Sequence, residues 1–230
     1  MTSDLETSDL EDVAIALGKL NSEVVFVGGM VCQFYAQSKA APAFRPTDDI
    51  DCVIEIHTHK EYAALEQQLR GLGFTHDTRQ GAPVCRKIFK NIKVDFMPSD
   101  EKVIGFTNKW FQVGLKHTIE IGLTRKIKIR ILELPYFLAT KFEALFDRGQ
   151  GDLYSHDFED IVNVLAYRKS FEDFEILPSI LKKALKEWAT AIIANRGILE
   201  IVKAHLPSYE SYQLAEKVLS VFQKMSKYEP

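Results

Sequence analysis

The chain has 230 residues, of which 46% are hydrophobic and 27% charged, a composition typical of a globular protein with a sizeable core. Its formal net charge of −3 gives no general attraction to nucleic acid, so such contacts would need a local basic patch. No apolar run is long enough to span a membrane, and the acidic N-terminus lacks the basic-then-apolar order of a signal peptide, so we expect a cytoplasmic protein without membrane contact.

The first part of the chain alternates predicted helices with short apolar strands. The opening TSDLETSDLED repeats TSDLE once, and Ser or Thr followed three residues later by an acid is a capping box that begins a helix extending to Leu20. The next elements are expected as a strand at 23–27, a helix at 30–39, a strand at 50–56 and a helix at 59–74.

The following residues are predicted to form mainly strands, and those after Leu134 are predicted to form helices only. Strands are expected at 84–89, 92–97, 117–123 and 125–132, with a short helix around 108–111. Helical patterns cover 134–149, 156–168, a long segment at 177–206, and 209–225. This order predicts an α+β fold with an α/β core, followed by a C-terminal helical region. We place the division between residues 1–132 and 133–230.

The stretch RPTDDIDCVIEI crowds aspartates at the start of an apolar strand. Alternation along a strand puts Asp49 and Asp51 on one face and the Ile and Cys side chains on the other. Carboxylates this close repel one another unless a cation lies between them, and hard oxygen ligands suit Mg²⁺. Turn chemistry is the alternative, and it accounts for Asp48 more readily than for Asp51, which lies inside the strand.

A third carboxylate, Asp95, lies on the later strand KNIKVDFMP, on the same side as Lys93 and opposite the apolar side chains. If this strand lies beside the first, Asp95 joins Asp49 and Asp51. Three converging carboxylates suit two-metal phosphoryl or nucleotidyl transfer, in which the third also draws a proton from the attacking hydroxyl. The alternative for Asp95 alone is a solvated charge on an edge strand.

The glycine pair Gly28-Gly29 lies between a predicted strand and a predicted helix. Glycines at such a turn let the backbone approach a phosphate closely, and the helix N-terminus supplies amide donors. A simple tight turn is the alternative for the pair taken alone.

Together, Gly28-Gly29, Asp49-Ile50-Asp51 and Asp95 resemble the nucleotidyltransferase superfamily. Its hallmark is a strand, Gly-[Gly/Ser] and a helix, then Asp-x-Asp on a strand and a third carboxylate on a later strand. The resemblance implies a mixed sheet flanked by helices as the core, with Mg²⁺ or Mn²⁺ as cofactor and an NTP as substrate. The implied metal ligands are Asp49, Asp51 and Asp95. The implied nucleotide contacts are Gly28, Gly29, Arg45 and Thr47, since the form R-x-T-x-D-I-D is similar to several members with Gly-Gly.

The helical part resembles the abortive-infection nucleotidyltransferases, which are the toxins of some toxin–antitoxin pairs. Their pattern carries a Lys on one helix and an Asp at the start of the next, and Lys141 and Asp157 occupy those places. This resemblance implies a catalytic role for both. The alternatives are a lysine whose stem packs on apolar surface, and helix N-terminus stabilisation by Asp157 and Asp160.

The sequence therefore predicts an enzyme that moves an NMP from an NTP to a hydroxyl acceptor, which is tRNA or another RNA, a protein or a small molecule. A toxin role would add an antitoxin as partner. A non-catalytic nucleotide-binding or partner-docking module on the same fold is the alternative, against which the three intact acids argue. Cys32, Cys52 and Cys85 lack the spacing of a zinc or redox site, and we expect three reduced thiols.

Overall fold

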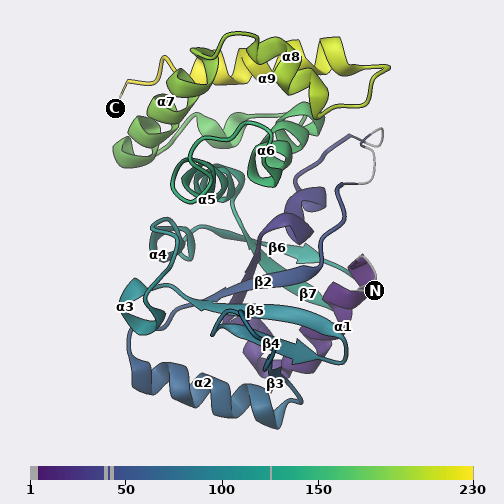
Figure 1. Cartoon of the computed structure of the whole chain (residues 1–230), viewed down its shortest axis with the longest axis vertical. Helices are drawn as coiled ribbons and strands as arrows, with labels where there is room; N and C mark the ends of the chain where they lie inside the picture. Colours follow the sequence, from purple (N-terminus) through teal and green to yellow (C-terminus); the bar gives the residue numbers. More distant parts are fainter. Residues whose placement is uncertain (1–4, 39–40, 42–43, 125, 230) are drawn as a thin grey trace. The chain divides into compact units, whose positions relative to one another are not determined.

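The computed structural model of the chain describes residues 5–38, 41, 44–124 and 126–229 (Figure 1). The chain divides into two compact units. Unit 1 consists of Met1–Val31 and Arg45–Glu133, and unit 2 consists of Cys32–Phe44 and Leu134–Pro230. Some predicted elements extend beyond the described residues, which exclude residues 2–4 of the TSDLE repeat, residue 39 of the helix at 30–39 and residue 125 of the strand at 125–132.

Unit 1 is built on a mixed sheet, and with the helices that flank it this confirms the predicted α+β fold class. Within the described residues the sheet has seven strands in the order β3-β4-β5-β2-β1-β7-β6. The strands are β1 (Val24–Val27), β2 (Asp49–Ile54), β3 (Thr75–His76), β4 (Arg86–Phe89), β5 (Ile92–Pro98), β6 (Thr118–Gly122) and β7 (Lys128–Leu132). The pairs β2–β5 and β1–β7 are parallel, and the other neighbours are antiparallel.

The helices of unit 1 are α1 (Thr7–Leu17), η1 (Gly18–Ser22), α2 (His59–Gly71), α3 (Glu101–Ile104) and α4 (Phe111–Gly114). Both long helices begin with a capping box, but the N-cap of α1 is Glu6 and not the predicted Ser or Thr. Asp9 accepts a hydrogen bond from the backbone N–H of Glu6 at 2.7 Å before α1. At α2, Thr58 Oγ1 accepts from the backbone N–H of Glu61 at 3.2 Å. Each side chain satisfies a helix N-terminal or flanking amide that has no partner within the helix.

The apolar face of the central strands forms the core of unit 1. Ile50, Cys52 and Phe96 are at most 1% exposed, as their alternation with aspartates predicts. Phe74 packs edge-on against Phe96 with ring centroids 5.5 Å apart. Tyr62 of α2 donates its hydroxyl to the carbonyl of Phe96 at 3.4 Å. These contacts fix β2 and β5, which carry the aspartates on their other face.

The predicted helix at 30–39 is helical only in its first part. The chain forms the 3₁₀ helix η2 (Gly29–Phe34) and then leaves the helical path. The backbone N–H groups of Gln37 and Ser38 both donate to the carbonyl of Tyr167, at 3.0 and 3.2 Å. These tertiary bonds take the donors that a longer helix would use, and they fasten this segment within unit 2.

Unit 2 is helical, as predicted. Its elements are α5 (Leu134–Phe146), α6 (His156–Tyr167), η3 (Glu172–Phe174), α7 (Ser179–Ile193), α8 (Ile198–Ala204) and α9 (Ser211–Met225). The long segment expected at 177–206 forms two helices, because Gly197 adopts a φ of +76° and the Asn195 side chain bonds the carbonyls of the preceding turn. No helix in the described part of the chain is long and apolar enough to cross a membrane.

The three cysteines are free thiols and all are buried. Burial raises the pKa of Cys52 well above its ordinary value and that of Cys85 to about 12. Because the thiolate is the reactive form, a thiol with that pKa carries about 10³-fold less thiolate near neutral pH than an ordinary cysteine. We therefore expect Cys85 in the native protein to react with a disulfide reagent about 10³-fold more slowly than in urea-unfolded protein. Ellman's assay checks this, and a native rate equal to the unfolded rate would contradict it.

Candidate active site

Three aspartates lie on one face of two neighbouring parallel strands in unit 1, β2 and β5. Asp51 on β2 is the register partner of Asp95 on β5, and Asp49 is the partner of Lys93. Since alternate residues share a face, Asp49, Asp51 and Asp95 project from the same side of the sheet. We call these three residues the aspartate row. Asp95 is buried, with 7% of its surface exposed, and does not project into solvent from a distant strand.

An arginine that the sequence analysis did not select completes this cluster. Arg86 on β4 is the register partner of Asp95. Its Nε donates to Asp95 Oδ1 at 2.8 Å, and its Nη2 donates to Asp95 Oδ2 and to Asp49 Oδ2, each at 2.8 Å. The guanidinium thus binds Asp95 in the bidentate fork geometry and bridges to Asp49. Its hydrogen bonds to Asp95 raise the pKa of Arg86 above its ordinary value, against the effect of burial.

The charges around Asp49 act in opposite directions. Burial raises the pKa of Asp49 above its ordinary value, the Arg86 guanidinium lowers it, and the Asp95 and Asp48 carboxylates raise it. The net shift is upward. Arg86 therefore offsets only part of the electrostatic cost of placing these carboxylates side by side.

The predicted glycine turn lies directly against the aspartate row. Gly28 has a φ of +75°, and a Cβ placed on it would lie 2.0 Å from Asp51 Oδ2. A Cβ on Gly29 would lie 2.7 Å from both Arg45 Nη2 and Thr47 Cγ2. A side chain at Gly28 would be strained by its positive φ and would displace Asp51, and one at Gly29 would displace the Arg45 or Thr47 side chain. The turn brings its backbone next to an aspartate carboxylate and an arginine guanidinium, and its phosphate-binding role stays a prediction.

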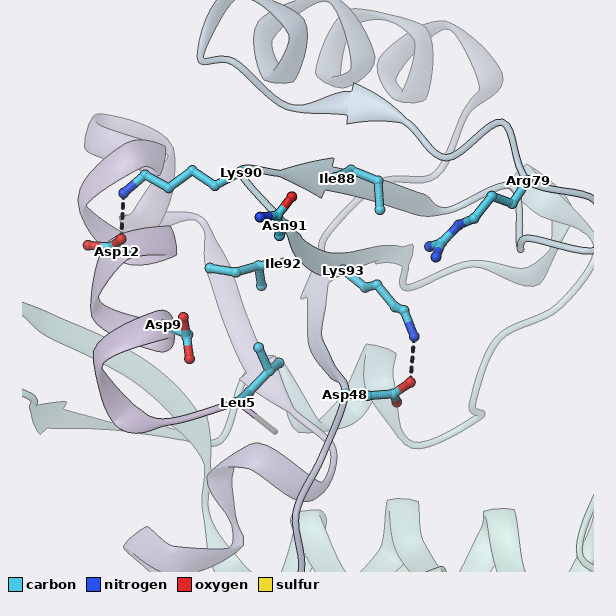
Figure 2. Close-up of a pocket in the computed structure, with 10 residues that line it drawn as sticks. All are labelled: Leu5, Asp9, Asp12, Asp48, Arg79, Ile88, Lys90, Asn91, Ile92 and Lys93. Carbon is cyan, nitrogen blue, oxygen red and sulfur yellow. Dashed lines mark hydrogen bonds and ion pairs between the residues drawn. The ribbon is translucent and has the colours of Figure 1, made fainter. Parts of the chain in front are cut away.

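A cavity of about 650 Å³ borders the aspartate row in unit 1, between α1 and the β4–β5 hairpin (Figure 2). Figure 2 shows Lys90 reaching Asp12 on α1, and Lys93 reaching Asp48 at the start of β2. Lys93 is the register partner of Asp49, which links the cavity to the row. The described lining residues are Leu5, Asp9, Asp12, Asp48, Arg79, Ile88, Lys90, Asn91, Ile92 and Lys93. The cavity therefore brings side chains of both signs to the border of the row.

The other two predicted catalytic residues lie in unit 2. Lys141 on α5 is buried, and its Nζ lies 3.1 Å from Asp157 Oδ1 and 2.6 Å from Asp160 Oδ2 on α6. Burial alone would lower the pKa of Lys141, but the Asp160 and Asp157 carboxylates raise it above its ordinary value. Arg148 also reaches Asp157, at 3.3 Å. Lys141 is thus a charged, buried lysine whose nearer partner is Asp160, which the sequence analysis ranked below Asp157.

The aspartate row has the donor chemistry of a Mg²⁺ site, since all three groups are oxygen ligands on one face. Asp49 Oδ2 and Asp95 Oδ2 each accept a hydrogen bond from Arg86 Nη2 at 2.8 Å, so these two oxygens are at most twice that distance apart. Among the residues that the structure describes, no three His, Cys, Asp or Glu side chains stand close enough to form a metal site. The Arg86 guanidinium lies between two of the carboxylates, with its Nη2 2.8 Å from both Asp49 Oδ2 and Asp95 Oδ2.

The similarity of this chain to known proteins is a similarity of fold. No protein-family model and no curated protein matches it. Among solved structures, it is similar to the crystal structure of an antigenic nucleotidyltransferase-like protein from Paracoccidioides brasiliensis. The sequences are 14% identical, and the match covers 88% of this chain and 95% of that one with a TM-score of 0.56. The chain therefore has the fold of a nucleotidyltransferase-like protein.

Proposed function

We propose that this chain is a metal-dependent nucleotidyltransferase that moves an NMP from an NTP to a hydroxyl acceptor. The observation that carries the proposal is the aspartate row, with Gly28 packed against Asp51. The similar fold of a nucleotidyltransferase-like protein supports it, although the site and not the fold carries the argument.

Asp49, Asp51 and Asp95 would hold Mg²⁺ or Mn²⁺, for which their oxygen donors are suited. The bound cation would neutralise charge on the phosphates of the NTP. Asp95 is the most buried of the three, and its carboxylate would orient the acceptor hydroxyl or take its proton.

Gly28, Gly29, Arg45 and Thr47 would contact the nucleotide. The two glycines lack the side chains that would keep a phosphate away from the backbone. Arg45 Nη2 lies close to Gly29, where a guanidinium would pair with phosphate oxygens. Thr47 is 8% exposed and its hydroxyl donates to Met30 Sδ at 3.4 Å, so its contact with the nucleotide would come from the small part of its surface that is exposed.

The catalytic roles of Lys141 and Asp157 stay predictions. Lys141 would offset phosphate charge, and Asp157 would position its ammonium group. The 3.1 Å ion pair between them supports the second role.

The acceptor is a hydroxyl of tRNA or another RNA, of a protein, or of a small molecule. The toxin-type role rests on the resemblance of α5 and α6 to the abortive-infection nucleotidyltransferases. If the chain has that role, expression of the wild-type chain would arrest growth, and co-expression of an antitoxin would relieve the arrest. Expression of Asp51→Asn would not arrest growth.

The test is label transfer from NTPs carrying ³²P at the α-phosphate. The protein is incubated with each NTP, Mg²⁺ and a cell extract, and products are separated into RNA, protein and small molecules. We expect wild-type protein to label one class and Asp51→Asn to label none. Glu55→Gln is the matched control, because Glu55 follows β2 at the end away from the row and is exposed. Equal labelling by wild type and Asp51→Asn would refute the proposal.

One observation favours the alternative of a non-catalytic nucleotide-binding or partner-docking module. Arg86 occupies oxygens of Asp49 and Asp95 that a cation would use. A module of this kind would bind NTP without transferring label, and its NTP affinity would not depend on Mg²⁺. Equilibrium binding of each NTP with Mg²⁺ and with EDTA separates the two functions.

A further inference from the structure

We propose that Arg86 is a built-in counter-cation of the aspartate row, which competes with a divalent cation for Asp49 and Asp95 and leaves them when the cation binds. This inference rests on the proposed function, because it names what controls metal loading at the same site.

The contacts show that Arg86 and a cation would need the same atoms. Both oxygens of Asp95 and Oδ2 of Asp49 accept hydrogen bonds from the guanidinium, each at 2.8 Å. Mg²⁺ binds carboxylate oxygens directly at about 2.1 Å and demands near-octahedral geometry. A guanidinium held at those oxygens would also lie within a few ångströms of the ion, where like charges repel. A guanidinium held at these oxygens therefore opposes the binding of a divalent cation there.

The local fold places Arg86 in this position. Residues 90 and 91 connect β4 to β5 in a tight hairpin, in which Lys90 has a φ of +53°. The hairpin register puts Arg86 directly opposite Asp95. The Arg86 side chain is 17% exposed, so part of it reaches the solvent and it is not fully enclosed by the core.

The contrary possibility is a purely structural role, in which Arg86 keeps its contacts whether or not a cation is present. If the role is structural, removing Arg86 disorders the carboxylates and weakens metal binding. If Arg86 competes with the cation, removing Arg86 strengthens metal binding, because the cation no longer has to displace a charged group. The two roles thus give opposite signs in one measurement.

The experiment is titration of the full chain with Mn²⁺, with free Mn²⁺ followed by electron paramagnetic resonance. We expect Arg86→Met to bind Mn²⁺ at least tenfold more tightly than wild type. Arg70→Met is the matched control, because Arg70 is an exposed arginine on α2 of unit 1, and we expect it to leave the affinity unchanged. Adding Asp51→Asn to Arg86→Met should abolish the gain, which locates the binding at the row.

A second measurement uses wild-type protein and so does not depend on how the variant folds. The Nε–H of Arg86 donates to Asp95 Oδ1, and its ¹⁵N–¹H signal, identified by its loss in Arg86→Lys, should move on addition of Mg²⁺. A signal that stays in place at saturating Mg²⁺ would overturn the inference, as would Mn²⁺ affinity in folded Arg86→Met that equals or falls below that of wild type. Those results leave the proposed function standing if Asp51→Asn still weakens Mn²⁺ binding. If Asp51→Asn has no effect on Mn²⁺ binding, the metal-dependent function itself fails.

Discussion

Lys141→Met lowers the free energy of unfolding by about 3–5 kcal/mol, which is the cost of removing one partner from a buried ion pair. Lys141 Nζ lies 2.6 Å from Asp160 Oδ2, and Asp160 is 1% exposed. Methionine fills nearly the same volume, so the loss reflects the buried carboxylates and not a cavity. Urea denaturation of wild type and variant, followed by circular dichroism, measures the difference.

Two variants test the cause of that loss. Arg148 also pairs with Asp157, but its side chain is 75% exposed, so Arg148→Ala should cost at most about 1 kcal/mol. The double variant Lys141→Met/Asp160→Leu removes both buried charges and should recover most of the stability. If Lys141→Met lowers the free energy of unfolding by no more than Arg148→Ala does, the ion pair between Lys141 and Asp160 does not stabilise the fold.

Much of this arrangement follows from side-chain periodicity. Alternation along 49–54 and 92–98 separates core residues from aspartates, and the structure has Ile50 and Phe96 buried on one face and the row on the other. Helical spacing likewise predicts that Lys141 lies on the apolar side of its helix, where it is buried. Ser155 is the N-cap of α6, and its Oγ accepts a hydrogen bond from the backbone N–H of Phe158 at 3.4 Å.

Features that depend on pairing between distant elements cannot be predicted from side-chain periodicity. Arg86 becomes visible only when a two-residue turn at 90–91 is assumed, because that turn pairs residue 86 with residue 95. Asp160 is one helical turn from Asp157, and periodicity alone does not say which of them meets α5. The end of the helix after Gly29 was misplaced because hydrogen bonds to Tyr167, far along the chain, replace those of a local helix.

Gly28→Ala is expected to reduce label transfer by about 10²-fold, because misplacement of a catalytic group by about 1 Å has an effect of that size. The new Cβ would lie 2.0 Å from Asp51 Oδ2, so the Asp51 carboxylate must move. The φ of +75° at Gly28 adds a backbone cost of about 1–2 kcal/mol for a residue with a side chain. Initial rates of the transfer assay and Mn²⁺ affinity, both measured on folded protein, report the displacement of Asp51.

Gly105→Ala separates the two effects in Gly28→Ala. Gly105 ends α3 with a φ of +85°, and a Cβ placed there would meet nothing within 4 Å. Both variants should therefore lose about 1–2 kcal/mol of stability, since both force alanine into the left-handed region. Only Gly28→Ala should lose Mn²⁺ affinity and transfer, because only its methyl group displaces an aspartate. Equal transfer rates in the two variants would mean that the contact between Gly28 and Asp51 has no part in the reaction, and the phosphate-binding role of the turn would have to be abandoned.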